Sequence, residues 1–356
     1  MTTADPQRGL IETAAVHKAF GDVAALTGAT LRVEPGEIVV LLGPSGSGKT
    51  TLLRAVAGFE RPDSGSIAIG GRMVAGGATW VEPEQRRIGM VFQHGALFPH
   101  LTVAGNVQFG APSERRALET LELVGLGARA KAYPHELSGG ERQRIALARA
   151  LAADPEVVLL DEPFAALDAG LRESLRDEVA RILRAAGTSA LLVTHDQAEA
   201  LSLADTIAVL RDGRVEQSGT PEAVYERPNS RWIAEFLGDA DLLPGTASEG
   251  VVQCELGRFP VSAELAGEVD VVVRPESVAI GHTAARANDT QAYVVERTFY
   301  GHDQLVHLEL PSGLRVRSRR LGFPAWHAGD RVRVWVDGPV SALAPPVAQE
   351  PAGTAR

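Results

Sequence analysis

A glycine-rich run near the N-terminus has the residue types that bind phosphate. Residues 43–50 read Gly-Pro-Ser-Gly-Ser-Gly-Lys-Thr and match the pattern G-x-x-x-x-G-K-[ST] in full. Glycines let the backbone form a nest of N–H groups around an anion, and a helix starting near Lys49 would aim its positive end there. Lys49 can reach the β- and γ-phosphates of a nucleotide, and the Thr50 hydroxyl can ligate Mg²⁺. A glycine-rich turn with an incidental lysine is the alternative. The predicted phosphate site comprises Gly43, Pro44, Ser45, Gly46, Ser47, Gly48, Lys49, Thr50 and Thr51.

Two carboxylates follow a second apolar run. Residues 157–160 are all Val or Leu and lead directly into Asp161 and Glu162. A parallel strand buried on both faces would carry this pair to its carboxyl end, where open α/β sheets bind ligands. Asp161 suits a Mg²⁺ shell, and Glu162 suits a general base that polarises water for attack on a γ-phosphate. Alone, such a pair is more often a solvated turn, but beside a phosphate loop it predicts a hydrolytic site.

The run at residues 137–151 narrows the class of phosphate-loop protein. Ser138 and two glycines lie where a helix would begin, so the hydroxyl and bare N–H groups would form a second anion site. An N-capped amphipathic helix with its apolar residues packed inward is the alternative. The sequence Leu-Ser-Gly-Gly-Glu, followed by Gln143 and Ala-Arg-Ala, resembles the signature motif of ATP-binding-cassette ATPases. Other phosphate-loop families lack this motif.

The resemblance extends, in order, to four more positions. Gln93 resembles the Q-loop glutamine, which touches metal and attacking water, and His195 resembles the switch histidine that contacts the γ-phosphate. Asp168 resembles the D-loop aspartate that crosses a dimer interface, and Phe20 holds the place of the A-loop aromatic that stacks on adenine. The implied catalytic residues are Lys49, Gln93, Glu162 and His195; the Mg²⁺ ligands are Thr50, Gln93 and Asp161; the ATP contacts are Phe20, residues 43–51, Ser138, Gly139, Gly140 and Asp168.

Two positions depart from the family pattern. Ala165 replaces the serine that commonly begins the D-loop, and Phe20 replaces the usual Tyr or Trp. Neither change removes a catalytic group. The resemblance implies ATP and Mg²⁺ as cofactors and a head-to-tail dimer in which ATP lies between the phosphate loop of one copy and the signature motif of the other. It also implies a permease-docking surface after Gln93, which we expect around residues 94–106.

The residue pattern predicts an α/β fold for the part that positions these groups. Glu37–Leu42, Val157–Leu160 and Ala190–Val193 read as strands buried on both faces. The apolar spacing over Gly170–Ala186 predicts an amphipathic helix, and the composition of Thr102–Tyr133 predicts a helical insertion. We therefore expect a P-loop NTPase cassette over residues 1–237, with a helical subdomain at about 94–153.

Residues 238–345 follow a different pattern, with short alternating segments and no confident helix. They predict a small all-β, OB-like barrel, followed by a flexible tail at 346–356. Arg274-Pro-Glu276 within it resembles the regulatory (TOBE) domain of importer ATPases. The predicted strands include Glu268–Arg274, Ala292–Arg297, Gln304–Leu310 and Arg331–Asp337.

Nucleic-acid binding and metal binding are the two alternative functions for this barrel. OB-type barrels can bind oligonucleotides, and five arginines between residues 297 and 320 lie near Phe299 and Tyr300. The net charge of −10 and the lack of regular aromatic interleaving argue against it, so no nucleic acid is expected. His302 and His307 are an odd number of residues apart, which puts them on opposite strand faces, so no metal site is expected there.

Composition constrains the cellular setting. Cys254 is the only cysteine and can form no internal disulfide, which suits a reducing compartment. No signal-peptide core and no run of about 18 apolar residues is present. We expect a cytoplasmic chain that reaches the membrane peripherally, through permease subunits, and indirectly serves a substrate-binding protein.

The expected cargo comes from resemblance alone. The chain looks most similar to ferric-iron importer ATPases, including at residues 98–103, 238–245 and 298–303. Importer ATPases for spermidine/putrescine, sulfate or sugar share the layout and remain alternatives. A soluble cassette ATPase of translation or DNA repair is a remoter one, since the chain has one cassette and no sustained heptads. A P-loop kinase would not explain residues 137–141.

Overall fold

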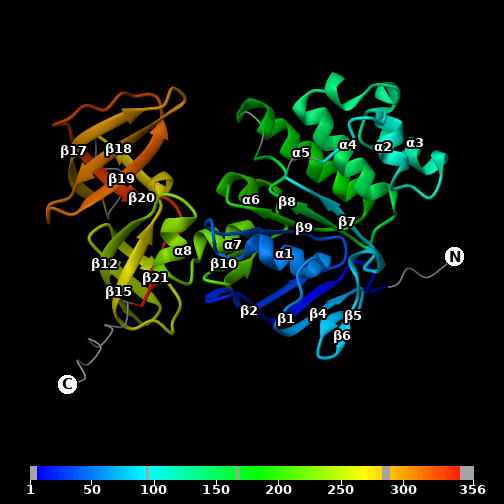
Figure 1. The fold of residues 1–356 in the computed structure, drawn as a ribbon. Helices are drawn as coiled ribbons and strands as arrows, with labels where there is room; N and C mark the ends of the chain where they lie inside the picture. The colour runs from blue at the N-terminus through cyan, green and yellow to red at the C-terminus, as the bar shows by residue number, and fades with distance from the viewer. Residues whose placement is uncertain (1–5, 94–95, 166, 168, 283–288, 345–356) are drawn as a thin grey trace. The chain divides into compact units, whose positions relative to one another are not determined.

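The computed structural model describes residues 6–93, 96–165, 167, 169–282 and 289–344 (Figure 1). The chain divides into two compact units, Met1–Val224 and Tyr225–Arg356, each described here by itself. Residues 225–237, which the sequence groups with the first domain, therefore pack with the second unit. Arg274, a buried arginine of the barrel, donates hydrogen bonds to main-chain carbonyls of this segment.

The first unit is built on a six-stranded sheet. Its order is β11-β10-β3-β9-β8-β7, and all neighbours are parallel except the β10–β11 hairpin. All residues of β3 and β9 are buried, as expected for strands covered on both faces. The three strands predicted from apolar runs are confirmed to within a residue or two. The strands are β3 (Ile38–Leu42), β7 (Ile88–Val91), β8 (Val157–Asp161), β9 (Ser189–Thr194), β10 (Thr206–Arg211) and β11 (Arg214–Gly219).

A five-stranded antiparallel sheet of order β2-β1-β4-β5-β6 forms a second layer of this unit. Helix α1 (Lys49–Ala57) lies between the two sheets (Figure 1) and contacts β2 on one side and β8 and β9 on the other. Leu52, Leu53 and Val56 of this helix are fully buried in the core that joins the layers. The strands are β1 (Ile11–Phe20), β2 (Val23–Val33), β4 (Ser64–Ile69), β5 (Arg72–Gly76) and β6 (Thr79–Trp80).

Further helices complete the first unit. The predicted helical insertion is confirmed by α2 and α3, and the predicted helix at 170–186 begins one residue earlier, at Ala169. Side-chain caps at Thr102, Ser113, Ser138 and Asp196 start four of the helices, which explains where they begin. The helices are α2 (Val103–Gln108), α3 (Glu114–Leu123), α4 (Gly139–Ala152), α5 (Ala169–Ala186) and α6 (Gln197–Leu203).

The second unit is a nearly closed antiparallel barrel, which confirms the predicted all-β domain. One sheet has the order β14-β13-β12-β15-β21 and the other β16-β20-β17-β18-β19, and a single apolar core fills both. Ser318 of β19 donates its hydroxyl to Val278 O of β16, which draws the ends of the second sheet together. Helix α8 (Arg231–Phe236) precedes the barrel, and α7 (Pro221–Glu226) spans the division.

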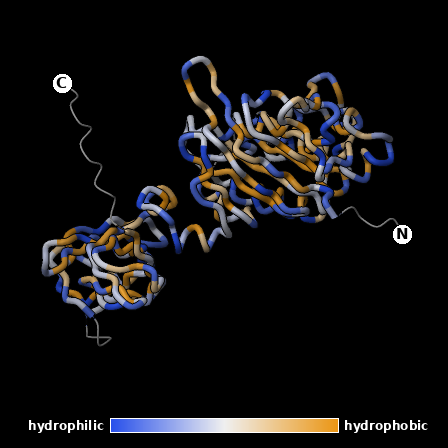
Figure 2. The backbone as a smooth tube through the Cα atoms, turned by 90° about the horizontal axis from the view of Figure 1, so that it is seen from below, coloured by the Kyte–Doolittle hydropathy of each residue, from blue (hydrophilic) through white to orange (hydrophobic). Residues whose placement is uncertain are grey.

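The barrel strands are β12 (Asp241–Ser248), β13 (Val251–Cys254), β14 (Gly257–Pro260), β15 (Gly267–Val273), β16 (Val278–Gly281), β17 (Thr290–Phe299), β18 (Asp303–Glu309), β19 (Arg315–Leu321), β20 (Arg331–Val336) and β21 (Ser341–Leu343). In Figure 2, hydrophobic segments run through the inner strands of each unit. Among the described residues, no helix is long and apolar enough to span a membrane.

Candidate functional site

The phosphate loop joins the end of β3 to the start of α1, as predicted. A Cβ at Gly43 would lie 2.2 Å from Leu210 O, and one at Gly48 would lie 2.3 Å from Ala25 O. Gly48 also has φ +103°, a conformation that side chains rarely adopt. It is the N-cap of α1 without any side-chain cap, so the first N–H groups of the helix stay open to an anion. Ser47 Oγ is buried and has no hydrogen-bond partner among the described residues.

Lys49 is folded back over this loop. Its side chain is buried, and Nζ donates to Gly43 O and Pro44 O, both at 2.8 Å. Burial lowers the pKa of Lys49, while the nearby carboxylates of Glu162 and Asp161 raise it. The ammonium is thus fixed beside the loop amides and close to the two acids from β8.

Asp161 and Thr50 form an oxygen-rich pair at the carboxyl edge of the parallel sheet. Thr50 Oγ1 lies 3.4 Å from Asp161 Oδ1. Burial raises the pKa of Asp161, and Arg54 is the largest influence that lowers it. Gln93 lies exposed just after β7, the strand that pairs with β8, so it belongs to the same edge. Hydroxyl, carboxylate and amide oxygens are the donors that a hard divalent cation prefers.

Glu162 and His195 meet at the same edge from neighbouring strands. His195 Nδ1 lies 3.3 Å from Glu162 Oε1, and Glu162 N donates to Val193 O at 3.0 Å. Glu162 has φ +42°, a strained conformation for a residue with a side chain, of a kind that clusters at functional sites. A small pocket of about 70 Å³ adjoins both side chains and extends to Arg172 and Glu199.

Behind His195 lies a hydrogen-bond network that the sequence analysis missed. Thr194 Oγ1 donates to the buried Glu199 at 2.6 Å and accepts from Asp196 N at 3.0 Å. Arg172 of α5 donates to Asp196 at 3.4 Å and to Leu167 O at 3.0 Å. The network thereby ties the His195 turn to the segment after Glu162. Asp196 followed three residues later by Glu199 is a capping-box spacing, and this signal could have indicated the turn.

The signature run begins a capped helix, α4, and its role as a second anion site stays a prediction. Ser138 Oγ accepts from Glu141 N at 3.2 Å, and Glu141 Oε2 accepts from Ser138 N at 2.8 Å. A Cβ at Gly139 would lie 2.9 Å from the Leu167 side chain. Helix α4 contacts α2, α3, α5 and β7, whereas α1 contacts β2, β8 and β9. The chain thus carries the signature motif and the phosphate loop on separate elements.

Of the remaining predicted site residues, some are exposed and others lie outside the described part of the chain. Phe20 ends β1 with 48% of its surface exposed, and Lys18 Nζ lies 5.2 Å from its ring. Asp168 lies outside the described residues, as does His94, where the predicted docking surface begins. Of that surface, Val103 is fully buried because α2 packs against α3 and α4, so less of the surface is apolar and exposed than predicted.

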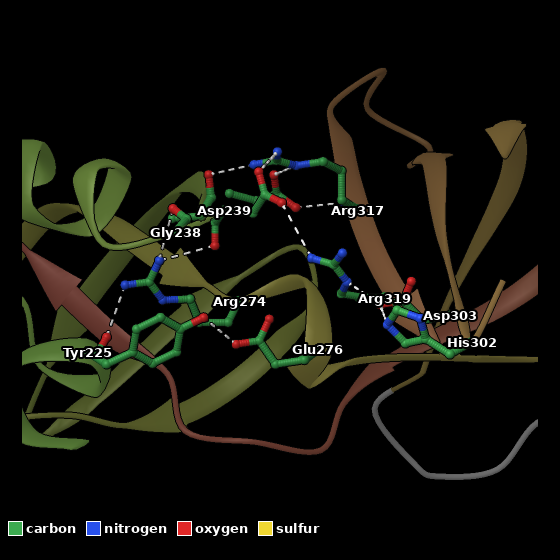
Figure 3. A network of polar contacts seen from close by, with 11 residues as sticks. Tyr225, Gly238, Asp239, Arg274, Glu276, His302, Asp303, Arg317 and Arg319 are labelled. Atoms are coloured by element: carbon green, nitrogen blue, oxygen red, sulfur yellow. Dashed lines mark hydrogen bonds and ion pairs between the residues drawn. The ribbon is translucent and has the colours of Figure 1, made fainter. Parts of the chain in front are cut away.

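In the second unit, Arg274 of the Arg-Pro-Glu triplet is a buried clamp (Figure 3). Its Nη1 donates to Ala234 O at 2.8 Å, Asp239 O at 3.1 Å and Gly238 O at 3.3 Å. Its Nη2 donates to Tyr225 O at 3.0 Å, and the guanidinium lies 4.0 Å from the Tyr225 ring. These hydrogen bonds, together with the packing of Ala234 against Val272 and Leu343, explain why residues 225–239 pack with the barrel.

The basic cluster of the barrel is largely paired with carboxylates. Arg317 lies 2.6 Å from Asp239 and 2.9 Å from Asp241. Arg319 lies 2.6 Å from Asp303 (Figure 3). Paired arginines have little charge left for phosphates, which supports the expectation that no nucleic acid binds; that expectation stays a prediction.

Comparisons with known proteins agree with this geometry. A family model for ABC transporters matches residues 26–165, and a model for TOBE domains matches residues 271–340. Among solved structures, the dimeric structure of MJ0796, a bacterial ABC transporter cassette, matches with a TM-score of 0.51 and 33% identity. The match covers 59% of this chain and 98% of that one.

Curated relatives match over both units. An Fe(3+) ions import ATP-binding protein FbpC of Pseudomonas fluorescens is 45% identical over 340 residues, which cover 88% of this chain and 96% of that protein. The FbpC of Mesorhizobium japonicum is 50% identical over 281 residues, 77% of this chain and 78% of that protein. A sulfate/thiosulfate import ATP-binding protein CysA of Burkholderia pseudomallei is 46% identical over 327 residues, 88% and 92% of the two chains.

Fold and site define an ATP-binding cassette with a C-terminal TOBE barrel. The chain belongs to the family of ABC transporter ATP-binding proteins, which are ATPases. The resemblance drawn from the motifs is confirmed.

Proposed function

We propose that the chain is the ATP-hydrolysing subunit of an import complex that moves ferric iron through a membrane permease. The observation that carries the proposal is the meeting of the phosphate loop, Asp161, Glu162 and His195 at one sheet edge, in a chain that is 45% and 50% identical to two Fe(3+) ions import ATP-binding proteins. Peripheral attachment at the cytoplasmic face, through permease subunits, follows from this role.

Each side chain at the edge has a distinct task in the proposed hydrolysis. The loop amides and Lys49 bind the β- and γ-phosphates, and Glu162 accepts a proton from the attacking water. His195, 3.3 Å from Glu162, contacts the γ-phosphate. The donor set fits Mg²⁺, which Thr50, Asp161 and Gln93 would hold; when bound, it neutralises charge on the β- and γ-phosphate oxygens.

A second copy of the chain completes the site. The Ser138 hydroxyl and the amides of Gly139 and Gly140 lie at the start of α4, which packs on elements other than those around α1. In a head-to-tail pair they reach the γ-phosphate held by the partner, with Asp168 at the same interface. Phe20 stacks on adenine through its exposed face. ATP then stabilises the pair by binding both copies at once.

The permease contact is proposed around residues 94–106, with Phe109 beside them. Asn106 is fully buried and ties the loop before α2 in place: its Oδ1 accepts from Phe98 N at 2.8 Å, and its Nδ2 donates to the carbonyls of Phe98 and Leu101. Phe109 is 70% exposed and its ring lies 4.6 Å from that of Phe98. A loop that Asn106 holds in place beside the exposed Phe109 suits a docking surface for another protein.

Transport assays in proteoliposomes test the cargo. With the permease and binding protein encoded beside this chain, ferric-loaded binding protein should stimulate ATP hydrolysis and drive iron uptake, and sulfate should do neither. The Glu162→Gln variant is the matched control for hydrolysis. Stimulation by sulfate instead of iron would move the chain to the sulfate/thiosulfate class, which the CysA relative makes the second candidate. Purification with nucleic acid in place of permease subunits would refute the importer role.

A further inference from the structure

A cavity of about 520 Å³ opens at one edge of the barrel, where β19 ends. Its walls come from the ends of β16 and β19, the start of β18 and the loop after β19, and include Ile280, Arg320 and Trp326. The volume falls within the range of about 300–1,000 Å³ typical of small-molecule sites, and the edge of a β-barrel is a common place for them. None of these residues belongs to the phosphate site.

One side of the cavity is apolar and includes large side chains that are exposed to solvent. Leu321 is 77% exposed and Phe323 is 83% exposed, while Trp326 is 4% exposed and packs against the His282 ring at 4.8 Å. A ligand that covered Leu321 and Phe323 would remove apolar surface from water.

The loop that carries these side chains is held in place. Gln304 is fully buried, and its Nε2 donates to Leu321 O at 2.8 Å and to Pro324 O at 2.7 Å. The apolar wall is thus formed before any ligand arrives, which lowers the entropic cost of binding.

The cavity also contains a partly buried cation, Arg320, whose charge Asp337 offsets only in part, since burial lowers the pKa of the guanidinium despite that carboxylate. Arg320 faces Gln304 across the β18–β19 register, on the inner side of the sheet, and its Nη2 is buried without a hydrogen-bond partner among the described residues. Arg319 also lines the cavity and is engaged at 2.6 Å by Asp303, which His302 also approaches at 3.7 Å (Figure 3). Asp303 is therefore neutralised at the rim, and the charge left inside the cavity is that of Arg320.

We propose that this cavity binds a small organic carboxylate with an apolar body. The carboxylate pairs with the Arg320 guanidinium, and the body packs on Ile280, Trp326 and Phe323. An arginine fork matches a carboxylate in geometry as well as charge, and apolar walls favour an organic anion over a bare inorganic one.

Calorimetric titration of the full-length protein with two matched probes tests this site. The anion 2-naphthoate should bind one site per chain, and the neutral 2-naphthamide should bind about tenfold or more weakly, because only the anion satisfies the buried cation. Inorganic sulfate as a third probe should bind more weakly than naphthoate. Equal affinities for naphthoate and naphthamide, no binding of either, or tighter binding of sulfate would each overturn the proposal.

Variants locate the site. Arg320→Met should weaken naphthoate about tenfold while leaving naphthamide unchanged, and Arg320→Lys should restore part of the loss. Phe323→Ala, at an exposed position, should weaken both probes by severalfold. Tyr293→Ala, an exposed aromatic of the same barrel outside the cavity, is the control and should change neither. If Arg320→Met fails to fold, the preference of the wild type for naphthoate over naphthamide and the Phe323→Ala result still test the site. Unchanged naphthoate binding in Phe323→Ala refutes the site.

Discussion

Replacing Arg274 by Met should detach the segment 225–239 from the barrel. Arg274 is 4% exposed, and its guanidinium donates to four main-chain carbonyls at 2.8–3.3 Å. Each hydrogen bond to a charged group contributes about 1.5–3 kcal/mol, and the variant also removes the desolvation cost of the cation, so we expect a net loss of about 3 kcal/mol. Methionine preserves most of the packing volume, so the loss reports on the polar contacts.

Hydrogen exchange measured by mass spectrometry reports this loss of stability segment by segment. Because 1.4 kcal/mol is a factor of ten, amides of α8 (Arg231–Phe236) and the residues after it should exchange about 100-fold faster in the variant. Amides of β17 and β18 should change much less. Arg331→Met, which removes an exposed arginine bonded to Tyr293, is the control and should alter neither set. Exchange of α8 that stays within about threefold of the wild type would refute the clamp.

Three other changes test separate parts of the account. Arg86 is 2% exposed and donates to carbonyls at the end of α1. Burial lowers its pKa to about 10, so it stays protonated. Arg86→Met should lower the free energy of unfolding in urea by about 3 kcal/mol, and a loss of less than about 1 kcal/mol would contradict this. The backbone hydrogen bond from Ser138 lowers the pKa of Glu141, so its stabilisation is present above the unfolded pKa and lost as pH falls through the folded pKa. Glu141→Gln should therefore cost about 0.5–1 kcal/mol at pH 7, the cost should disappear as the pH falls through the lowered pKa of folded Glu141, and a pH-independent cost would be inconsistent. Phe20→Ala should weaken ATP binding about 2- to 12-fold in equilibrium titration, with no change expected if adenine binds elsewhere.

The phosphate loop could be predicted from sequence because its chemistry is local. The glycines of residues 43–48 are required by close backbone contacts and positive φ, and the strand before and helix after them have clear patterns. Asp161 and Glu162 were predictable for the same reason, since a buried strand ends at them. The role of His195 came from resemblance, and its 3.3 Å contact with Glu162 is known only from the structure.

Long-range polar contacts could not be predicted in this way. Arg172, Thr194 and Glu199 meet through α5, β9 and α6, and no sequence spacing reveals that their side chains converge. Arg274 was recognised as part of a motif, but its hold on residues 225–239 depends on the folded barrel. For the same reason the compact units divide at Val224, earlier than the composition change near Gly238 suggested.

The most direct test of the central claim is the assembly state of Glu162→Gln with ATP, measured by sedimentation velocity. Removing the proposed base leaves the phosphate loop and signature helix intact, so ATP should bind and join two copies without being hydrolysed. The account predicts a stable dimer with ATP and Mg²⁺, monomer with ADP, and hydrolysis reduced at least about 100-fold. Wild-type hydrolysis, or a variant that stays monomeric with saturating ATP, would contradict it.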